Sequence, residues 1–136
     1  MTDLILALHR ATHATLHALA RDLADLDLTN SETNVLAVLA DGLPRAVGVL
    51  AAATATRSTT LTNVLDRLVV RGLVVREVDP EDRRSFVVVL TDSGLETAAA
   101  VDAAVQRLER AALSVVGQRE LAGFQAVLDA LTEGSR

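Results

Sequence analysis

Polar and basic side chains are clustered in the middle of the chain, within residues 57–67. They offer hydrogen-bond donors and acceptors together with positive charge, and they are Arg57, Ser58, Thr59, Thr60, Thr62, Asn63 and Arg67. An asparagine amide donates and accepts at once, which matches the major-groove edge of adenine, and threonine adds a methyl group that can touch a thymine methyl. The segment is therefore a candidate for contacts with the bases and phosphates of DNA.

The same segment carries apolar residues at helical spacing. They occupy positions i, i+3, i+4 and i+7, and they are Leu61, Val64, Leu65 and Leu68. This pattern predicts a helix with one buried face and the polar residues on the opposite side. Gly72 is expected to end the helix. On the polar side, Arg67 is expected to contact DNA, with pairing to a nearby acid as the alternative, and Asp66 to pair with Arg67 or remain solvated.

A charged turn follows this helix. Residues 79–84 separate two runs rich in β-branched residues, 73–78 and 85–90, and this arrangement predicts a β-hairpin with an exposed tip. Arg83 and Arg84 lie at the tip, where guanidinium groups can reach phosphates or an adjacent minor groove. The hairpin is therefore the second candidate for contact with DNA.

Two shorter helices must hold these groups in place. Thr29 and Glu32 fit the Ser/Thr-x-x-Glu capping box, so a helix should begin there and stop at Gly42. Residues 46–53 are expected to form a short third helix. Two short helices, a helix with a polar outer side and a hairpin predict a winged helix-turn-helix, a mainly α fold with a small β-hairpin wing, whose DNA-binding region spans about residues 29–91.

Long amphipathic helices are predicted at both ends of the chain. Apolar residues recur at helical spacing over residues 4–26, again over about twenty residues from Leu95, and, after a break at Gly117, from Leu121 to Leu131. A long helix with an apolar stripe buries little area in a small monomer, so these helices are expected to pack against a second copy. The prediction is a homodimer formed through residues of about 1–26 and 93–132.

Three histidines on the first predicted helix could also do chemistry. His9, His13 and His17 are spaced i, i+4, i+8, which is compatible with a metal pair or with a pH-sensitive dimer contact. No carboxylate or cysteine at fixed spacing accompanies them, and eight residues of helix spread them over a wide arc. A solvated or interfacial edge is the favoured interpretation, with no metal expected.

Length and charge limit the possible functions. The chain has 136 residues, of which 50% are apolar, and it is expected to form a single domain over residues 1–136 without a membrane span or signal peptide, which favours the cytoplasm. It has no cysteine, which excludes disulfides and thiol-based peroxide sensing. The net charge is −5, but the segment from Arg45 to Arg84 carries +2. This distribution suits a protein that presents one face to DNA.

The chain resembles the MarR family of bacterial regulators over nearly its whole length. Residues 79–84 followed by Leu90-Thr91-Asp92-Ser93-Gly94 look like that family's Asp-x-Arg wing and its Leu-Thr-x-x-Gly start of the fifth helix. The run at residues 60–68, closing on residues 71–74, is similar to the family's recognition helix. The sequence departs from the family at Arg57, where a serine is usual, and at Asn63, where a basic residue is common.

The resemblance implies a homodimer on double-stranded DNA with a pseudo-palindromic operator. It also implies a repressor that a small-molecule effector releases. Asp82 is expected, by the same resemblance, to orient a neighbouring arginine of the wing. No catalytic residue and no cofactor follow from the resemblance.

Two alternatives differ in class from a DNA-binding regulator. An enzyme is not expected, because the chain lacks a glycine-rich phosphate loop, a His-Glu-x-x-His motif and a nucleophile elbow. A winged helix that binds proteins and no DNA is favoured mildly by the net negative charge. Arginines on both the recognition helix and the wing tip weigh against that alternative.

Overall fold

The computed structural model describes residues 3–135, so residues 1, 2 and 136 of the predicted single domain lie outside the described part. The described chain forms two compact units, of which the first ends at Val105 and the second begins at Gln106. The first unit contains most of the secondary structure, and the second contains the end of one helix and the whole of the last. Each unit is described by itself.

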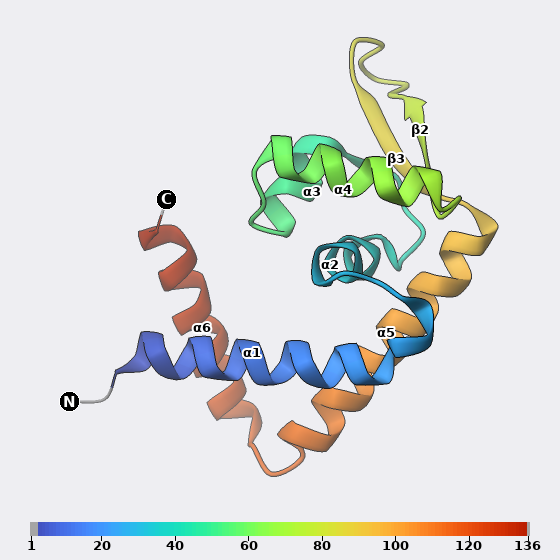
Figure 1. Ribbon diagram of the computed structural model, residues 1–136. Helices are drawn as coiled ribbons and strands as arrows, with labels where there is room; N and C mark the ends of the chain where they lie inside the picture. Colours follow the sequence, from blue (N-terminus) through green and yellow to red (C-terminus); the bar gives the residue numbers. More distant parts are fainter. Residues whose placement is uncertain (1–2, 136) are drawn as a thin grey trace. The chain divides into compact units, whose positions relative to one another are not determined.

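Three short helices form the centre of the first unit. They are α2 (Asn30–Leu39), α3 (Val47–Ala53) and α4 (Ser58–Val70), and Figure 1 shows α3 and α4 beside the hairpin. Helix α2 begins with the predicted capping box, because the Thr29 hydroxyl accepts the Glu32 N–H and the Glu32 carboxylate accepts the Thr29 N–H. The predicted order of helices in this region is confirmed.

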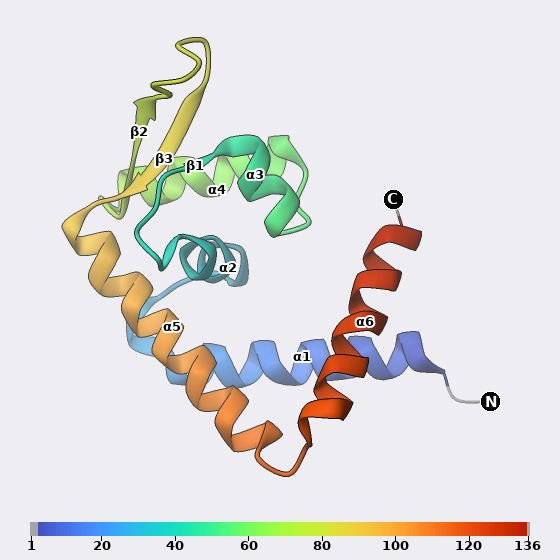
Figure 2. The ribbon, with the colours of Figure 1, turned by 180° about the vertical axis from the view of Figure 1, so that it is seen from behind.

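The sheet has three strands, one more than the sequence predicted. Strands β2 (Val74–Val78) and β3 (Phe86–Leu90) form the expected hairpin, in which Val74 lies opposite Leu90 and Val78 opposite Phe86. A third strand, β1 (Arg45–Ala46), pairs antiparallel with the other side of β3, as Figure 2 shows from behind. Two residues carry no periodicity of their own, so only the partner strand makes β1 a strand.

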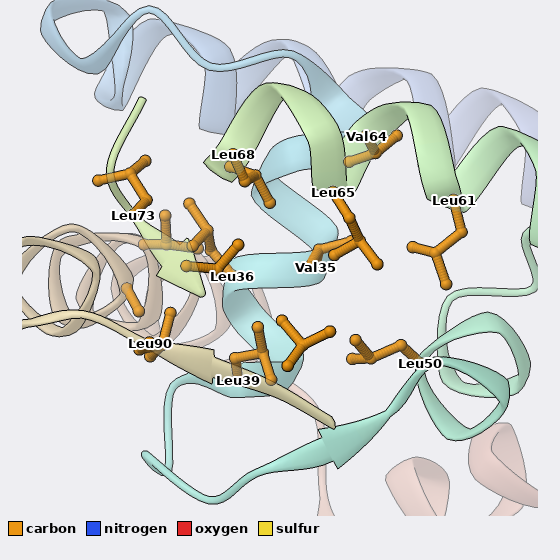
Figure 3. Close-up of a cluster of buried hydrophobic side chains, with 14 of the residues drawn as sticks. Val35, Leu36, Leu39, Leu50, Leu61, Val64, Leu65, Leu68, Leu73 and Leu90 are labelled. Carbon is orange, nitrogen blue, oxygen red and sulfur yellow. The ribbon is translucent and has the colours of Figure 1, made fainter. Parts of the chain in front are cut away.

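One hydrophobic core joins these elements. The leucines and the valine predicted to face inward from α4 are all buried with exposures of 0–2%, and Figure 3 shows them directed at side chains of α2, α3 and the sheet. The cluster continues through Leu36 and Leu39 of α2, Leu50 of α3 and Val88 of β3. Each fully buried leucine contributes about 1.5–3 kcal/mol to folding. The core therefore fixes which side of α4 remains outside.

The long helices begin and end close to the predicted positions. Helix α1 (Leu4–Asp22) stops earlier than expected, and a 3-10 turn (Ala24–Leu26) completes the segment predicted as one helix. Asp27 then adopts a left-handed conformation with φ of 51°, which turns the chain toward α2. Helix α5 spans Asp92–Leu113 and α6 spans Gln118–Gly134. Within residues 3–135, no helix has the length and apolar character needed to cross a membrane.

The Leu-Thr-x-x-Gly segment joins the sheet to α5. The Thr91 hydroxyl donates to the Gly72 carbonyl at 2.6 Å and accepts the Gly94 N–H at 3.0 Å. A β-carbon at Gly94 would lie 1.8 Å from the Leu73 carbonyl oxygen, which is far inside van der Waals contact. Glycine is therefore required at position 94, because the first turn of α5 packs directly on the backbone that follows α4.

Helices α3 and α4 end in the same hydrogen-bond pattern with different residues. After α3, Ala55 N–H donates to Ala52 and Thr56 N–H to Ala51, and after α4, Gly72 and Leu73 repeat these bonds. This is the Schellman motif, whose penultimate residue is left-handed and usually glycine. Gly72 has φ of 73° and Ala55 has φ of 51°. The turn of the helix-turn-helix therefore holds an alanine in a conformation that disfavours a β-carbon.

Replacing Ala55 with glycine and replacing Gly72 with alanine should change the free energy of unfolding in opposite directions. Ala55→Gly should raise the free energy of unfolding by about 0.5–1 kcal/mol, because left-handed alanine is strained, and Gly72→Ala should lower it by about 1 kcal/mol. No side chain lies within 4 Å of a β-carbon at Gly72, so the backbone alone sets its cost. Urea unfolding at one protein concentration measures both changes, and a destabilised Ala55→Gly variant would contradict the assignment.

Candidate nucleic-acid interface

The outer side of α4 presents the predicted polar residues to solvent. Ser58, Thr59, Thr60, Thr62, Asn63 and Arg67 are all exposed. The Thr62 hydroxyl donates to the Ser58 carbonyl at 2.8 Å, so its proton is engaged while its methyl group and its oxygen lone pairs stay available. The amide of Asn63 has no hydrogen-bond partner among residues 3–135. An external donor and acceptor can therefore pair with it.

The first turn of α4 has no side-chain cap. Arg57 occupies the N-cap position with φ of −66° and ψ of 145°, and its side chain accepts no N–H group. A serine or threonine oxygen there would satisfy one of the free N–H groups at the helix start, whereas a guanidinium has no acceptor. Those N–H groups and the Arg57 cation together favour an anion at the helix start.

Two threonines order the turn between α3 and α4. The Thr54 hydroxyl donates to the Leu50 carbonyl at 2.7 Å, and the Thr56 hydroxyl donates to the Thr54 carbonyl at 3.1 Å. Both hydroxyl groups bond to the backbone of the turn, so the turn gives a defined entry into α4.

Asp82 organises the tip of the wing. Its carboxylate accepts the Arg84 N–H at 3.1 Å and the Ser85 hydroxyl at 3.2 Å, and the Ser85 N–H donates to the Asp82 carbonyl. Arg83 and Arg84 are exposed, and their guanidinium groups form no ion pair within the described chain. Asp82 therefore holds the main chain at Arg84 while the arginine side chain extends freely.

The acid on the outer side of α4 has a partner in the wing. Asp66 bonds to Arg76 of β2 at 2.5 Å, whereas the sequence had predicted a pair with Arg67 or a solvated carboxylate. The predicted pair with Arg67 was wrong, because Arg76 belongs to another element, which only the fold brings to α4. The carboxylate still remains 56% exposed. Arg67 has no ion-pair partner in the part of the chain that the structure describes, so its charge remains available.

Arg71 anchors the far end of α4. Its guanidinium donates to the carbonyls of Leu26 and Asp27 at 2.6 and 2.7 Å, and it lies 3.7 Å from a Glu32 oxygen. Glu32 is only 3% exposed, and that oxygen has no hydrogen-bond partner. Arg71 therefore supplies the charge that compensates a buried carboxylate and fixes α4 against the start of α2.

The three histidines of α1 lie outside this interface. His9, His13 and His17 are exposed. Across residues 3–135, no group of three His, Cys, Asp or Glu side chains converges on a position for a metal ion. That they form a solvated or interfacial edge without a metal stays a prediction, with a metal pair or a pH-sensitive dimer contact as the alternatives.

Sequence patterns did not identify Arg76 and Arg71, the residues that connect α4 to β2 and to the start of α2. Arg76 shares a face of β2 with Val74, but Arg76 is exposed whereas Val74 is buried. The run at residues 73–78 therefore gave no signal that Arg76 is paired. Arg71 gave no signal either, because its partners are backbone carbonyls about 45 positions away.

A helix-turn-helix followed by a hairpin, with exposed polar residues on α4 and arginines at the tip, defines a winged helix-turn-helix protein. Residues 26–85 match a family model described as the MarR family. The chain is therefore similar to the MarR family over residues 26–85. It is also 38% identical over 81 residues to the HTH-type transcriptional repressor NicR of Pseudomonas putida. That match covers 60% of this chain and 49% of the repressor, so the chain matches about half the length of this relative.

Solved structures extend the similarity to the whole fold. The structure of S. aureus MepR in its DNA-binding conformation is similar with a TM-score of 0.89 and 21% identity, covering 99% of this chain and 100% of that one. The transcriptional repressor CouR bound to a 23-mer DNA duplex is similar with a TM-score of 0.75 and 28% identity, covering 92% and 89%. The match to MepR therefore takes in nearly the whole of this chain.

A serine at the start of α4 should stabilise the protein. Arg57→Ser should raise the free energy of unfolding by about 1 kcal/mol relative to Arg57→Ala, because a serine oxygen can accept the N–H of Thr60. Both variants remove the guanidinium, so their difference isolates the cap. Urea unfolding at one protein concentration measures it, and equal stabilities would mean that this N–H is already satisfied.

Proposed function

We propose that the protein is a homodimeric, sequence-specific DNA-binding regulator of transcription that acts as a repressor. The observation that carries the proposal is the joint exposure of Asn63 on α4 and of Arg83 and Arg84 on the wing. A helix fits the major groove, and a hairpin tip beside it can reach phosphates or the minor groove. The names of NicR and CouR as transcriptional repressors support the same function.

The charges suit this role. Residues 1–41 carry a net charge of −4 and residues 92–136 carry −3, whereas the segment that includes α4 and the wing carries +2. Arg57 lies at the start of α4, where its cation joins the free N–H groups of the first turn. Positive charge is thus concentrated on the elements that would face phosphates, while the rest of the chain is acidic.

Unpartnered apolar stripes support the dimer. Neither α1 nor α6 has a buried residue. On α1, Ile5 and Leu6 are 47% and 52% exposed, and on α6, Phe124 and Val127 are 53% and 46% exposed. Exposed apolar stripes of this length mark surfaces that associate with another chain. A second copy of the protein would cover the apolar faces of both helices in one symmetric interface. A two-fold dimer would present two α4 helices to a pseudo-palindromic operator.

A cavity beside α1 is a candidate for a small-molecule effector. It measures about 200 Å³ and lies between the end of α1 and the start of α2, with Leu16, Leu19, Leu23 and Thr33 among its lining residues. NadR, a structural neighbour at 23% identity, was solved in complex with 4-hydroxyphenylacetate. We propose that binding of an effector of comparable size in this cavity releases the protein from DNA.

A winged helix that binds only proteins is the second candidate, because the net charge of −5 disfavours nonspecific contact with nucleic acid. No catalytic role is proposed. Selection of bound fragments from genomic DNA by the purified protein separates the two candidates. Recovery of a shared palindromic sequence, with affinity that falls as salt rises, supports DNA regulation; recovery of no enriched fragment at low salt contradicts it.

Two substitutions on the interface should impair DNA binding in different ways. Arg84→Ala should weaken binding to operator and random duplexes alike and reduce the salt slope by about one for each phosphate that is no longer neutralised. Asn63→Ala should cost about 1–3 kcal/mol of discrimination at one symmetric pair of operator positions, while the salt slope stays nearly constant. Fluorescence anisotropy over a series of salt concentrations measures both effects.

The contrast between the two variants decides the role of each residue. Arg83→Ala should resemble Arg84→Ala with a smaller effect. A uniform fall in affinity in Asn63→Ala would make that residue a backbone contact. If neither Arg84→Ala nor Asn63→Ala changed binding, this face would not be the DNA-binding face.

A charge on the apolar stripe of α6 should break the dimer. Leu128 is half-buried on this stripe, so Leu128→Glu should shift the protein toward monomer and reduce DNA affinity, because a buried unpaired carboxylate is strongly unfavourable. Ala126→Glu adds the same charge to the opposite, exposed side of α6 and serves as the control. Light scattering at micromolar concentration measures the mass, and a folded wild-type monomer would contradict the proposal.

A further inference from the structure

The ion pair between Asp66 and Arg76 joins the two elements of the proposed interface. Asp66 belongs to α4, Arg76 to β2, and their side chains meet at 2.5 Å. Neither residue is needed to complete the core, because the Asp66 side chain is 56% exposed and the Arg76 side chain is 32% exposed. An exposed pair of this kind contributes little to stability, about 0–1 kcal/mol. Because the pair contributes so little to stability, its position between α4 and β2 points to a role in function.

Asp66 lies on the same side of α4 as the residues proposed to contact bases. It follows Asn63 by three positions and Thr59 by seven, and residues at these spacings share one helix face. A carboxylate on that face repels phosphates, and it is the only acid on α4. Left uncompensated, it would oppose DNA binding on the outer side of α4.

Arg76 lies where the core face of the hairpin emerges into solvent. It shares that face of β2 with Val74, which is 1% exposed, and with Val78, which is 53% exposed. Its cross-strand neighbour is Val88, which is fully buried. The strand therefore fixes the base of the Arg76 side chain beside α4, and the guanidinium reaches Asp66 from a rigid support.

We propose that Arg76 is a positioning residue for DNA binding, which neutralises Asp66 and fixes its carboxylate so that α4 presents no free negative charge to phosphates. This inference rests on the proposed DNA-binding function. Arg76 acts through Asp66 and contributes no base contact of its own. The pair keeps an acid on the recognition helix without the electrostatic penalty that the acid alone would cause.

Charge neutralisation and simple tethering predict opposite signs for Asp66→Asn. Under neutralisation, Arg76→Gln exposes the carboxylate and should weaken binding to operator and random duplexes by about tenfold at low salt, because electrostatics dominate both affinities. Asp66→Asn removes the carboxylate and frees the Arg76 cation, so affinity should stay equal or rise. The double variant should recover to within about threefold of wild type.

Tethering of the wing predicts a different result. If the pair only held the wing against α4, both single variants would weaken binding equally and the double variant would be no better. That outcome would overturn the proposal. Arg76→Lys retains the positive charge, so it should bind nearly as well as wild type, and a weakening equal to that of Arg76→Gln would also overturn it.

The chain offers a matched control for the experiment. Arg45 and Asp41 form another Arg–Asp pair at 2.5 Å, outside α4 and the hairpin, so Arg45→Gln should weaken DNA binding much less than Arg76→Gln. Thermal unfolding of every variant reports whether the fold persists. If Arg76→Gln did not fold, Asp66→Asn would still decide, because weaker binding by that variant contradicts neutralisation.

The measurement separates the failure of this inference from that of the proposed function. Binding of wild type to a selected duplex tests the function, and the variants test the role of Arg76. If wild type bound no duplex, both would be overturned. If wild type bound and Arg76→Gln bound equally well at low salt, only the role of Arg76 would be overturned.

Discussion

Burial of one face of α4 is the constraint on which the rest of the protein depends. Leu61, Val64, Leu65 and Leu68 are 0–2% exposed, and together they contribute several kcal/mol of burial free energy, at about 1.5–3 kcal/mol for each side chain. Rotating α4 by one residue would expose this face and bury polar groups without partners, which costs more than a domain of this size can lose. The outward direction of Asn63 therefore follows from the core.

Backbone contacts carry that constraint to the wing and to the first turn of α5. The Schellman motif at Gly72 ends α4 and starts β2, and the Thr91 hydroxyl bonds to the same glycine from the start of α5. Close approach of Gly94 to the Leu73 carbonyl completes the joint. These contacts bring the end of α4, the hairpin and the first turn of α5 to one place, so a shift in one of them disturbs the others. Arg71 and Glu32 do the same for α4 and α2.

The charge distribution on the outer side of α4 and on the wing follows from these contacts. The Arg83 and Arg84 side chains are left without acidic partners among residues 3–135, while Arg71 and Arg76 are engaged by Glu32 and Asp66. Thus arginines that look equivalent in the sequence divide into structural and available groups. An acidic chain can present a basic face to DNA because Glu32 and Asp66 are already compensated within the fold.

The sequence by itself determined the features that depend on local geometry. Helical spacing selected the buried face of α4, the Thr29 and Glu32 capping box began α2, and Gly72 ended α4, because each depends on residues within one or two turns. Only the tertiary structure decided the β1 strand at Arg45 and Ala46, the end of α1 at Asp22, and the pairing of Asp66 with Arg76 in place of Arg67. Each of these arises where one element meets another, and local periodicity carries no information about which partner an element will meet.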